Sequence, residues 1–229
     1  MKDVRASRIA AGFFMVALPG ILLAGGARSG AWSLPGAGHF SSCSRPVTSS
    51  PESLLGEHYS PEENLESIDV DLIDHARQSL EIAMYAFTDR PIADAVLRAA
   101  SRGVHVWIYR DGIQVKDRGD KSRRILFSRP GQSGAVQIEV KRNSSRNIMH
   151  LKAYEIDGKW LRTGSANWSP PGEGAWCSRG KRLHQDQQDN NLFITDDPRE
   201  IRKFESTFRR IWTRETNRPW SQNMSRRRS

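Results

Sequence analysis

The chain has 229 residues, of which 35 are Lys or Arg and 26 are Asp or Glu, giving a net charge of +9 and a pI near 10. This length accommodates one compact domain with extensions. Its two cysteines, neither in a C-x-x-C pair, exclude a disulfide framework and argue against a structural zinc site. The charge is typical either of an ordinary basic protein or of one with a polyanionic partner, nucleic acid or an anionic membrane surface.

The first 27 residues have the layout of a secretory signal peptide. Basic residues precede an apolar run at residues 9–24, and small residues follow it. The run is slightly shorter than the roughly 20 residues that span a bilayer. We therefore expect an exported protein, periplasmic or secreted; the alternative is a retained anchor, with membrane association through residues 9–24. Residues 28–56 are rich in Gly, Ser and Pro and predict a flexible linker.

A globular domain is expected at residues 57–213. Ser60 as N-cap, Pro61 at the first helical position and Glu63 as the capping-box acid predict a helix start. The elements expected next are a helix carrying apolar residues at helical spacing up to Leu80, a strand at 80–87, a helix at 91–102 and a strand at 104–109. This alternation is typical of a βαβ unit and predicts an α/β fold with a largely parallel sheet.

The second half predicts more strands than helices. Its expected elements are a short helix at 121–128, strands at 136–140, 150–156, 160–163 and 191–194, and a helix from Asp197 to about Trp212. Asp157 and Gly158 form the turn between two of these strands. Residues 214–229 predict a basic, disordered tail.

One string in this half carries the chemistry. His150, Lys152, Asp157, Ser165 and Asn167 form the pattern H-x-K-x4-D-x6-G-S-x-N. His150 and Lys152 are two apart on a predicted strand, so their side chains face the same side. The loop after the return strand brings Ser165 and Asn167 beside them if the hairpin forms. We expect all five groups to converge at one edge of the sheet.

This set contains what is needed to attack a phosphodiester without a metal or other cofactor. A neutral imidazole is a competent nucleophile towards phosphorus. Lys152, the Asn167 amide and the Ser165 hydroxyl can stabilise the charge that develops on the phosphate oxygens. No Asp/Glu cluster with Mg²⁺ or Ca²⁺ spacing accompanies them. A second acid must protonate the leaving oxygen, and the motif supplies only one histidine.

An ordinary hairpin with a surface His, a surface Lys and an Asp-Gly turn is the competing interpretation. For any one of these residues it is the better one. The complete spaced set favours catalysis.

The pattern resembles the signature of the phospholipase D superfamily. The flanking segments YSPEENLESIDVDLIDHARQSLEIAMYAFTDRPIADAVLRAASRGVHVWIYRDG and QQDNNLFI, together with the motif string, resemble its small, single-motif bacterial nuclease branch. The likeness covers roughly residues 58 to 212. It implies an α/β sandwich in which helices flank a mixed sheet.

The resemblance also implies roles that the residues alone do not. The active form would be a homodimer with a shared site, in which one His150 forms a phosphohistidine and the other protonates the leaving group. Lys152 and Asn167 would hold the phosphate, with Ser165 assisting. Asp189 would orient the histidine, or would be a solvated loop residue. Asp157 belongs to the motif, and its place in the turn also suits a supporting role.

Basic residues near the motif are candidate phosphate contacts, although each alone could be an ordinary surface residue. The candidates are Arg129, Lys141, Arg142, Arg146 and the basic tail. Trp168 is placed either to stack on a base or to pack in the core. Residues 169–187 are longer than the usual connection in this family and contain Cys177 and His184, too few for a zinc site.

Three functions follow, in order of preference. The first is a metal-independent endonuclease cleaving DNA or RNA. The second is a phospholipid hydrolase of the phospholipase D or cardiolipin type, which would predict an apolar rim or a retained anchor. The third is a noncatalytic nucleic-acid-binding module, which the intact motif disfavours.

Overall fold

The computed structural model describes residues 50–127, 138–144, 146–175, 177–178, 181–182 and 187–219. The predicted signal segment, most of the linker, Arg129 and Cys43 lie outside these ranges. The elements in chain order are η1 (Pro51–Leu54), β1 (Gly56–Ser60), α1 (Leu65–Asp74), β2 (Ser79–Met84), α2 (Arg90–Ser101), β3 (His105–Arg110), η2 (Gln114–Lys116), α3 (Ser122–Phe127), β4 (Ile138–Arg142), β5 (Lys152–Ile156), β6 (Trp160–Gly164), β7 (Cys177–Ser178), β8 (Lys181–Arg182), β9 (Asn190–Thr195), α4 (Pro198–Trp212) and β10 (Arg218–Pro219).

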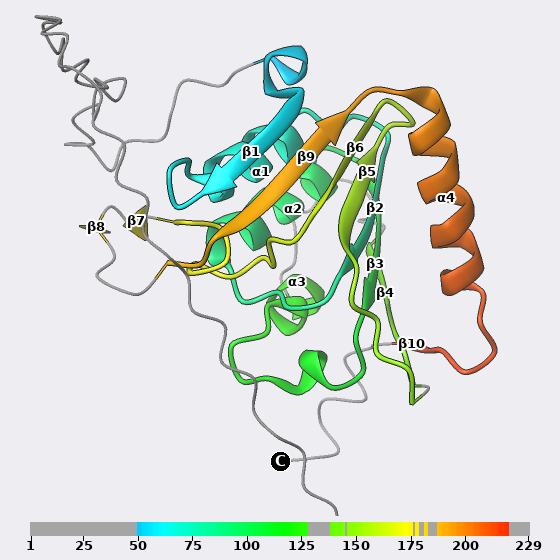
Figure 1. The fold of residues 1–229 in the computed structure, drawn as a ribbon. Coiled ribbons are helices and arrows are strands. Elements are labelled where there is room, and N and C mark those ends of the chain that lie inside the picture. Colours follow the sequence, from blue (N-terminus) through cyan, green and yellow to red (C-terminus); the bar gives the residue numbers. More distant parts are fainter. Residues whose placement is uncertain are drawn as a thin grey trace, which may run out of the picture. The chain divides into compact units, whose positions relative to one another are not determined.

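The main sheet has eight strands in the order β1-β9-β6-β5-β2-β3-β4-β10 (Figure 1). The predicted α/β class, with helices flanking a mixed sheet, is confirmed. The expectation that the sheet is largely parallel is wrong, because only the β2–β3 and β3–β4 pairs in it are parallel. Parallel neighbours need a crossover of a dozen or more residues, whereas β5 and β6 are joined by a tight turn and must be antiparallel.

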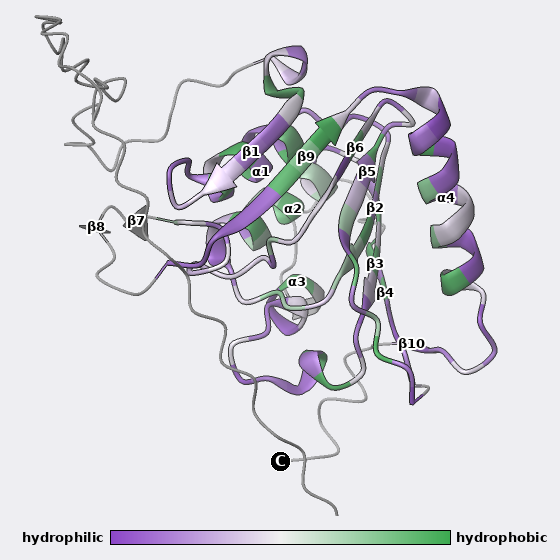
Figure 2. Ribbon diagram, viewed as in Figure 1, coloured by the Kyte–Doolittle hydropathy of each residue, from purple (hydrophilic) through white to green (hydrophobic). Residues whose placement is uncertain are grey.

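Helices cover both faces of this sheet, and each face has its own core (Figure 1). Alternate residues of a strand point to opposite faces, so Ile82 of β2 joins the core under α1 and α2 while Ala83 joins the core under α4. Figure 2 shows hydrophobic and hydrophilic residues alternating along α4. Its apolar stripe supplies Ile201, Phe204, Phe208 and Ile211 to the second core. Within the described ranges, no helix has the length and apolar character needed to cross a membrane.

The first helix begins later than its predicted cap. Ser60 ends β1, and α1 begins at Leu65, where the Asn64 side chain accepts a hydrogen bond from the N–H of Ser67 at 3.2 Å. Glu63 instead accepts the N–H of Tyr59 at 3.0 Å. Pairing of β1 with β9 takes up the residues that would otherwise start the helix.

Both predicted boundaries of the domain also differ from the structure. Residues 51–56, predicted as linker, form η1 and the start of β1, and Leu54 is buried in the first core. At the other end, β10 lies in the predicted tail and pairs with β4. Buried apolar contacts and strand pairing order these segments, and a Gly/Ser/Pro-rich or basic composition does not reveal either.

Two carboxyl groups face each other under α4. Glu81 of β2 stands opposite Glu155 of β5. The pKa of Glu81 is raised from the usual 4.5 to about 7, chiefly by burial and then by the charge of Glu205 on α4, with Arg209 opposing. The pKa of Glu155 is raised from 4.5 to about 8, again chiefly by burial, with the N–H of Gly158 opposing and Glu81 and Glu205 adding to the rise.

This pair predicts a loss of stability as the pH rises from about 4.5 to about 8. Between the usual 4.5 and the raised values of about 7 and about 8, the native state binds more protons than the unfolded chain. The free energy of unfolding therefore falls as the pH rises through this window. In Glu155→Gln, urea unfolding at about pH 5 and about pH 8 should show a smaller difference than in the wild type. Exposed Glu200→Gln on α4 is the control; an unchanged difference in Glu155→Gln would contradict the assignment.

Candidate active site

His150 and Lys152 stand together where β5 begins. The Lys152 Nζ lies 3.0 Å from Nδ1 and 3.1 Å from Nε2 of the imidazole, and it donates to the main-chain oxygen of His150 at 2.8 Å. His150 is exposed, whereas Lys152 is only 7% exposed. Burial lowers the pKa of Lys152, and the nearby charge of Arg162 lowers it too. An accessible imidazole thus lies directly against a fixed cation.

Tyr85, directly after β2, completes this corner of the site. Its ring lies 4.5 Å from the imidazole of His150, centroid to centroid, and 5.0 Å from the Lys152 Nζ. Its N–H donates to the main-chain oxygen of Leu151 at 2.9 Å, and its hydroxyl accepts from the side chain of Gln114 at 3.2 Å. The ring therefore restricts how the imidazole can turn and leaves one side of it open.

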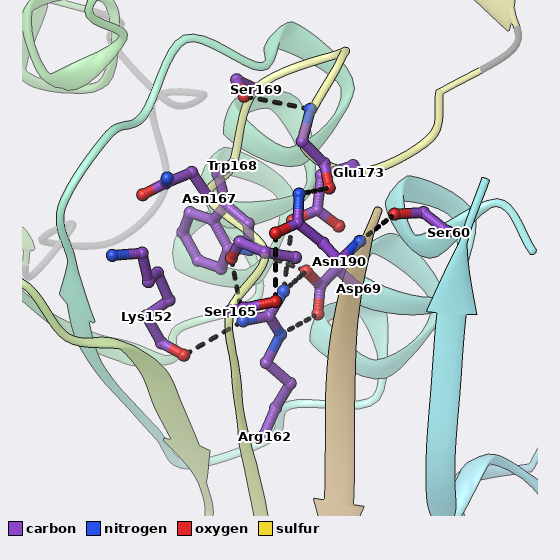
Figure 3. Close-up of polar contacts among 12 residues, drawn as sticks. Ser60, Asp69, Lys152, Arg162, Ser165, Asn167, Trp168, Ser169, Glu173 and Asn190 are labelled. Atoms are coloured by element: carbon purple, nitrogen blue, oxygen red, sulfur yellow. Dashed lines mark hydrogen bonds and ion pairs between the residues drawn. The ribbon is translucent and has the colours of Figure 1, made fainter. Parts of the chain in front are cut away.

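Asn167 reaches the same corner from the loop after β6. Its Oδ1 accepts the N–H of Ala86 at 3.2 Å, which leaves the Nδ2 group to donate elsewhere. Figure 3 shows the side-chain ends of Lys152 and Asn167 directed to the same side. The loop starts at Gly164, whose φ of +153° and close approach to β9 suit only glycine, since a Cβ there would lie 2.4 Å from the main-chain oxygen of Asn191.

Ser165 and Asp189 lie together beside β9, and neither contacts His150 through a hydrogen bond in the described structure. The Ser165 hydroxyl donates to the Asn190 side chain at 3.0 Å and accepts the N–H of Asn191 at 2.9 Å. Asp189 is exposed and lines a cavity of about 660 Å³ with Ser165 and Tyr59. Ser165 therefore ties the Asn167 loop to β9.

Asp157 lies at the opposite end of β5 from Lys152, so the expectation that all five motif groups converge is wrong. Its carboxylate accepts the main-chain N–H groups of Arg77, Gln78 and Ser79 at 2.9, 2.8 and 2.8 Å. The residue itself has φ +57°, a left-handed turn conformation that Asp tolerates. It fastens the β5–β6 turn to the segment that enters β2.

A buried set of charges lies beneath the motif (Figure 3). Arg162 donates to both carboxylate oxygens of Asp69 at 3.0 Å and to Glu173 at 3.1 Å. It also donates to the main-chain oxygens of Lys152 at 3.0 Å and Ala166 at 3.3 Å. Burial raises the pKa of Glu173 well above its usual range, and the charge of Asp69 adds to the rise. One guanidinium thus joins the strand of Lys152 to the loop of Asn167.

The predicted nucleic-acid contacts lie in different parts of the structure. Trp168 is fully buried, donates its Nε1 hydrogen to Asp69 at 2.8 Å and packs on Phe87 and Tyr154, so the expectation that it stacks on a base is wrong. Lys141 packs over Trp212, 4.5 Å from the ring centroid. Arg142 and Arg146 line a second cavity near His150, and Arg129 lies outside the described ranges.

Comparison with known proteins establishes the family. Residues 70–212, more than half of the chain, match the family described as "Cardiolipin synthase, PLD-like domain". The chain belongs to the phospholipase D superfamily. The resemblance predicted from the motif is confirmed.

Two solved structures share the fold of this phospholipase D superfamily member. Nuc, a phospholipase D family member from Salmonella typhimurium, is 24% identical, with a TM-score of 0.58, and the match covers 72% of this chain and 96% of Nuc. NucT from Helicobacter pylori is 26% identical, with a TM-score of 0.57, covering 72% of this chain and 97% of NucT.

The curated relatives that this chain matches are named mitochondrial cardiolipin hydrolases. The mitochondrial cardiolipin hydrolase of Xenopus tropicalis is 29% identical over 143 residues, covering 62% of this chain and 58% of the relative. That of Drosophila melanogaster is 30% identical over 164 residues, covering 62% and 56%. The chain thus spans little more than half the length of these relatives.

Sequence patterns missed several residues that build the site. Asp69 carried a signal, because it follows Leu65 by four residues on the apolar stripe of α1 and a carboxylate there needs a buried partner. Arg162 interrupts an apolar strand in the same way. Tyr85 carried none, since a tyrosine after a buried strand is commonly a core residue.

Proposed function

We propose that the protein is a phosphodiesterase that cleaves nucleic acid, DNA or RNA, through a covalent phosphohistidine at His150 and without a metal cofactor. One observation carries this proposal: the Lys152 ammonium lies 3.0 Å from the imidazole. A phosphate held by Lys152 therefore sits against the nucleophile, and such positioning supplies a large part of catalysis.

The reaction follows from this arrangement. An imidazole nitrogen of His150 attacks phosphorus, and the bond to the leaving alkoxide breaks while a new P–N bond forms. Lys152 and the Asn167 Nδ2 group stabilise the charge on the non-bridging oxygens. The alkoxide takes a proton from a general acid. Water deprotonated by the conjugate base of that acid then attacks phosphorus, breaking the P–N bond and freeing His150.

The general acid comes from a second copy of the chain in this proposal. The motif occurs once in the sequence, so a second chain's His150 is the group of the right type. Two exposed apolar side chains flank the histidine, Ile148 at 59% and Leu151 at 39% exposure. Such side chains beside a half-complete site support its burial against a second copy.

Subunit mixing tests the shared site. Wild-type chains are mixed and refolded with an equal amount of His150→Ala chains, and the activity is compared with that of the same total amount of wild-type protein. The mixture should show about a quarter of that activity if both histidines of a dimer are needed, and about a half if each chain acts alone. Light scattering on the same samples gives the mass of the active species. A fully active monomer would contradict the shared site.

A phospholipid substrate is the second candidate, supported by the curated relatives named cardiolipin hydrolases. The purified chain should be offered plasmid DNA, single-stranded DNA, RNA and cardiolipin vesicles side by side in excess EDTA. Cleavage of nucleic acid in chelator is the expected result. Cleavage of lipid alone would replace the proposal with the second candidate, and nucleic-acid binding without cleavage would indicate a noncatalytic module. Activity lost with chelator would contradict the metal-free mechanism.

A further inference from the structure

A small basic cavity lies beside the catalytic corner. Its volume is about 230 Å³, and its lining includes three cationic side chains from three different segments: Lys116 at the end of η2, Arg142 at the end of β4, and Arg146 in the loop that follows. Lys116 and Arg146 are exposed. Cations from separate segments that converge on one hollow favour an anionic ligand there.

The main chain fixes the shape of this cavity. Gly112 forms one wall and packs against Asn143 so closely that a Cβ would lie 2.0 Å from the Asn143 main-chain oxygen. Asn143 is itself buried; its N–H donates to the main-chain oxygen of Arg110 at 2.9 Å, and its side-chain amide donates to the main-chain oxygen of Asn147. The loop that carries Arg146 is therefore held from within.

Among the described residues that line the cavity, Asp111 carries the one carboxylate, and main-chain donors occupy it. Asp111 accepts the N–H groups of Ile113 at 2.9 Å, Gln114 at 3.1 Å and Met149 at 3.0 Å. Hydrogen bonds of this kind offset much of the negative charge that an incoming anion would meet. The bond to Met149 also fastens the cavity to the residue before His150.

The cavity lies within reach of the attacked phosphorus. Ile148 lines it, and two residues of chain span at most about 7 Å, so the cavity wall and His150 are neighbours. Its volume of about 230 Å³ is smaller than the roughly 300–1,000 Å³ of sites that enclose a whole small molecule. Its cationic lining favours a charged phosphate group over an uncharged nucleobase.

We propose that the cavity lined by Lys116, Arg142 and Arg146 binds a phosphate of the substrate strand next to the one attacked at His150. This inference rests on the proposed function and narrows its substrate to a polymer that carries a further phosphodiester next to the scissile one. Arginine suits this role because its planar guanidinium contacts two phosphate oxygens at once.

The test compares a substrate that has flanking phosphates with one that has none. The variants Lys116→Ala and Arg146→Ala are assayed on a single-stranded oligonucleotide and on bis(4-nitrophenyl) phosphate, a diester with a single phosphate. The ratio of kcat/KM for the oligonucleotide to kcat/KM for the small diester is expected to fall about 5- to 10-fold in each variant, as for the loss of one charged contact. Lys159→Ala and Arg202→Ala, exposed and remote from the cavity, are the matched controls and should leave the ratio unchanged.

Binding supplies a readout that does not depend on cleavage. In a His150→Ala background, fluorescence anisotropy measures oligonucleotide affinity as a function of salt. The slope of log K against log salt is negative. Each of the two variants should reduce its magnitude by about 0.7, the value for one phosphate contact on a single strand. Unchanged slopes and an unchanged substrate ratio would overturn the inference. If Lys116→Ala and Arg146→Ala change activity only on cardiolipin vesicles, the inference is also overturned, and the cavity is assigned to a lipid with two phosphates. If the salt slopes change as expected but the wild-type protein does not cleave nucleic acid, the result would count against the proposed reaction alone.

Discussion

His150→Ala is expected to lower kcat for nucleic-acid cleavage by at least about 10⁴-fold, because loss of a covalent nucleophile removes the pathway itself. Affinity for the substrate should change little, since Lys152 and Asn167 remain to hold the phosphate. Single-turnover cleavage in EDTA measures the chemical step, and fluorescence anisotropy measures binding. The variant should fold normally because His150 is exposed.

His105→Ala is the matched control. His105 is also exposed, but it lies at the start of β3, whereas Arg110 and Asp111 lie at the other end of this strand. The His105→Ala variant should cleave nucleic acid at the wild-type rate. Residual cleavage by His150→Ala within about tenfold of the wild type would remove His150 as the nucleophile. An acid-sensitive adduct on the wild-type chain, consisting of the phosphoryl group with the retained nucleotide fragment still esterified to it, would identify the intermediate directly if intact mass detects it after a rapid quench and it is missing from His150→Ala.

The parts of the site that sequence predicted correctly depend on local spacing. His150 and Lys152 are two residues apart at the start of a strand, and a two-residue period alone places their side chains on one side. Asn167 follows a strand that pairs with β5 through a tight turn, so its return to the same corner also follows from the hairpin. The α/β class came from the alternation of helices and strands in the same way.

The parts that sequence misplaced depend on contacts between distant segments. The carboxylate of Asp157 binds main-chain groups 78 to 80 residues earlier, so its role is set by where β2 enters the sheet. Trp168 follows Asn167 directly, yet its Nε1 hydrogen bonds to Asp69 of α1, and this buried partner decides between core and surface. No local pattern contains either fact.

Arg162 supports both the core of the fold and the candidate active site. Its guanidinium and the carboxylates of Asp69 and Glu173 are fully buried in their ion pairs. Burial opposes the charge on Arg162, but Asp69 and then Glu173 raise its pKa on balance. Taking one partner from such a group leaves uncompensated charge inside the protein. The structure offers a surface counterpart, because Arg98 binds Asp74 through two bonds of 3.0 and 2.9 Å with its side chain 43% exposed.

Arg162→Met is therefore expected to lower the free energy of unfolding by about 3–5 kcal/mol, the usual cost of breaking a buried ion pair. This is a large share of the roughly 5–15 kcal/mol that keeps a domain folded. Arg98→Met should cost no more than about 1 kcal/mol, as exposed pairs do. Urea unfolding of both variants at the same pH gives the two values. Equal costs would contradict the assignment of Arg162 to a buried network.

Arg162→Lys separates the positioning role from plain stability. A lysine keeps the positive charge towards Asp69, but it cannot also donate to the main-chain oxygens of Lys152 and Ala166 as the guanidinium does. Lys152 and Asn167 then lose their common support, and a misplacement of about 1 Å can cost about 10²-fold in rate. We expect kcat to fall by that order at temperatures where the variant is fully folded by circular dichroism, with KM changing less. A folded Arg162→Lys with wild-type kcat would restrict Arg162 to holding the core together.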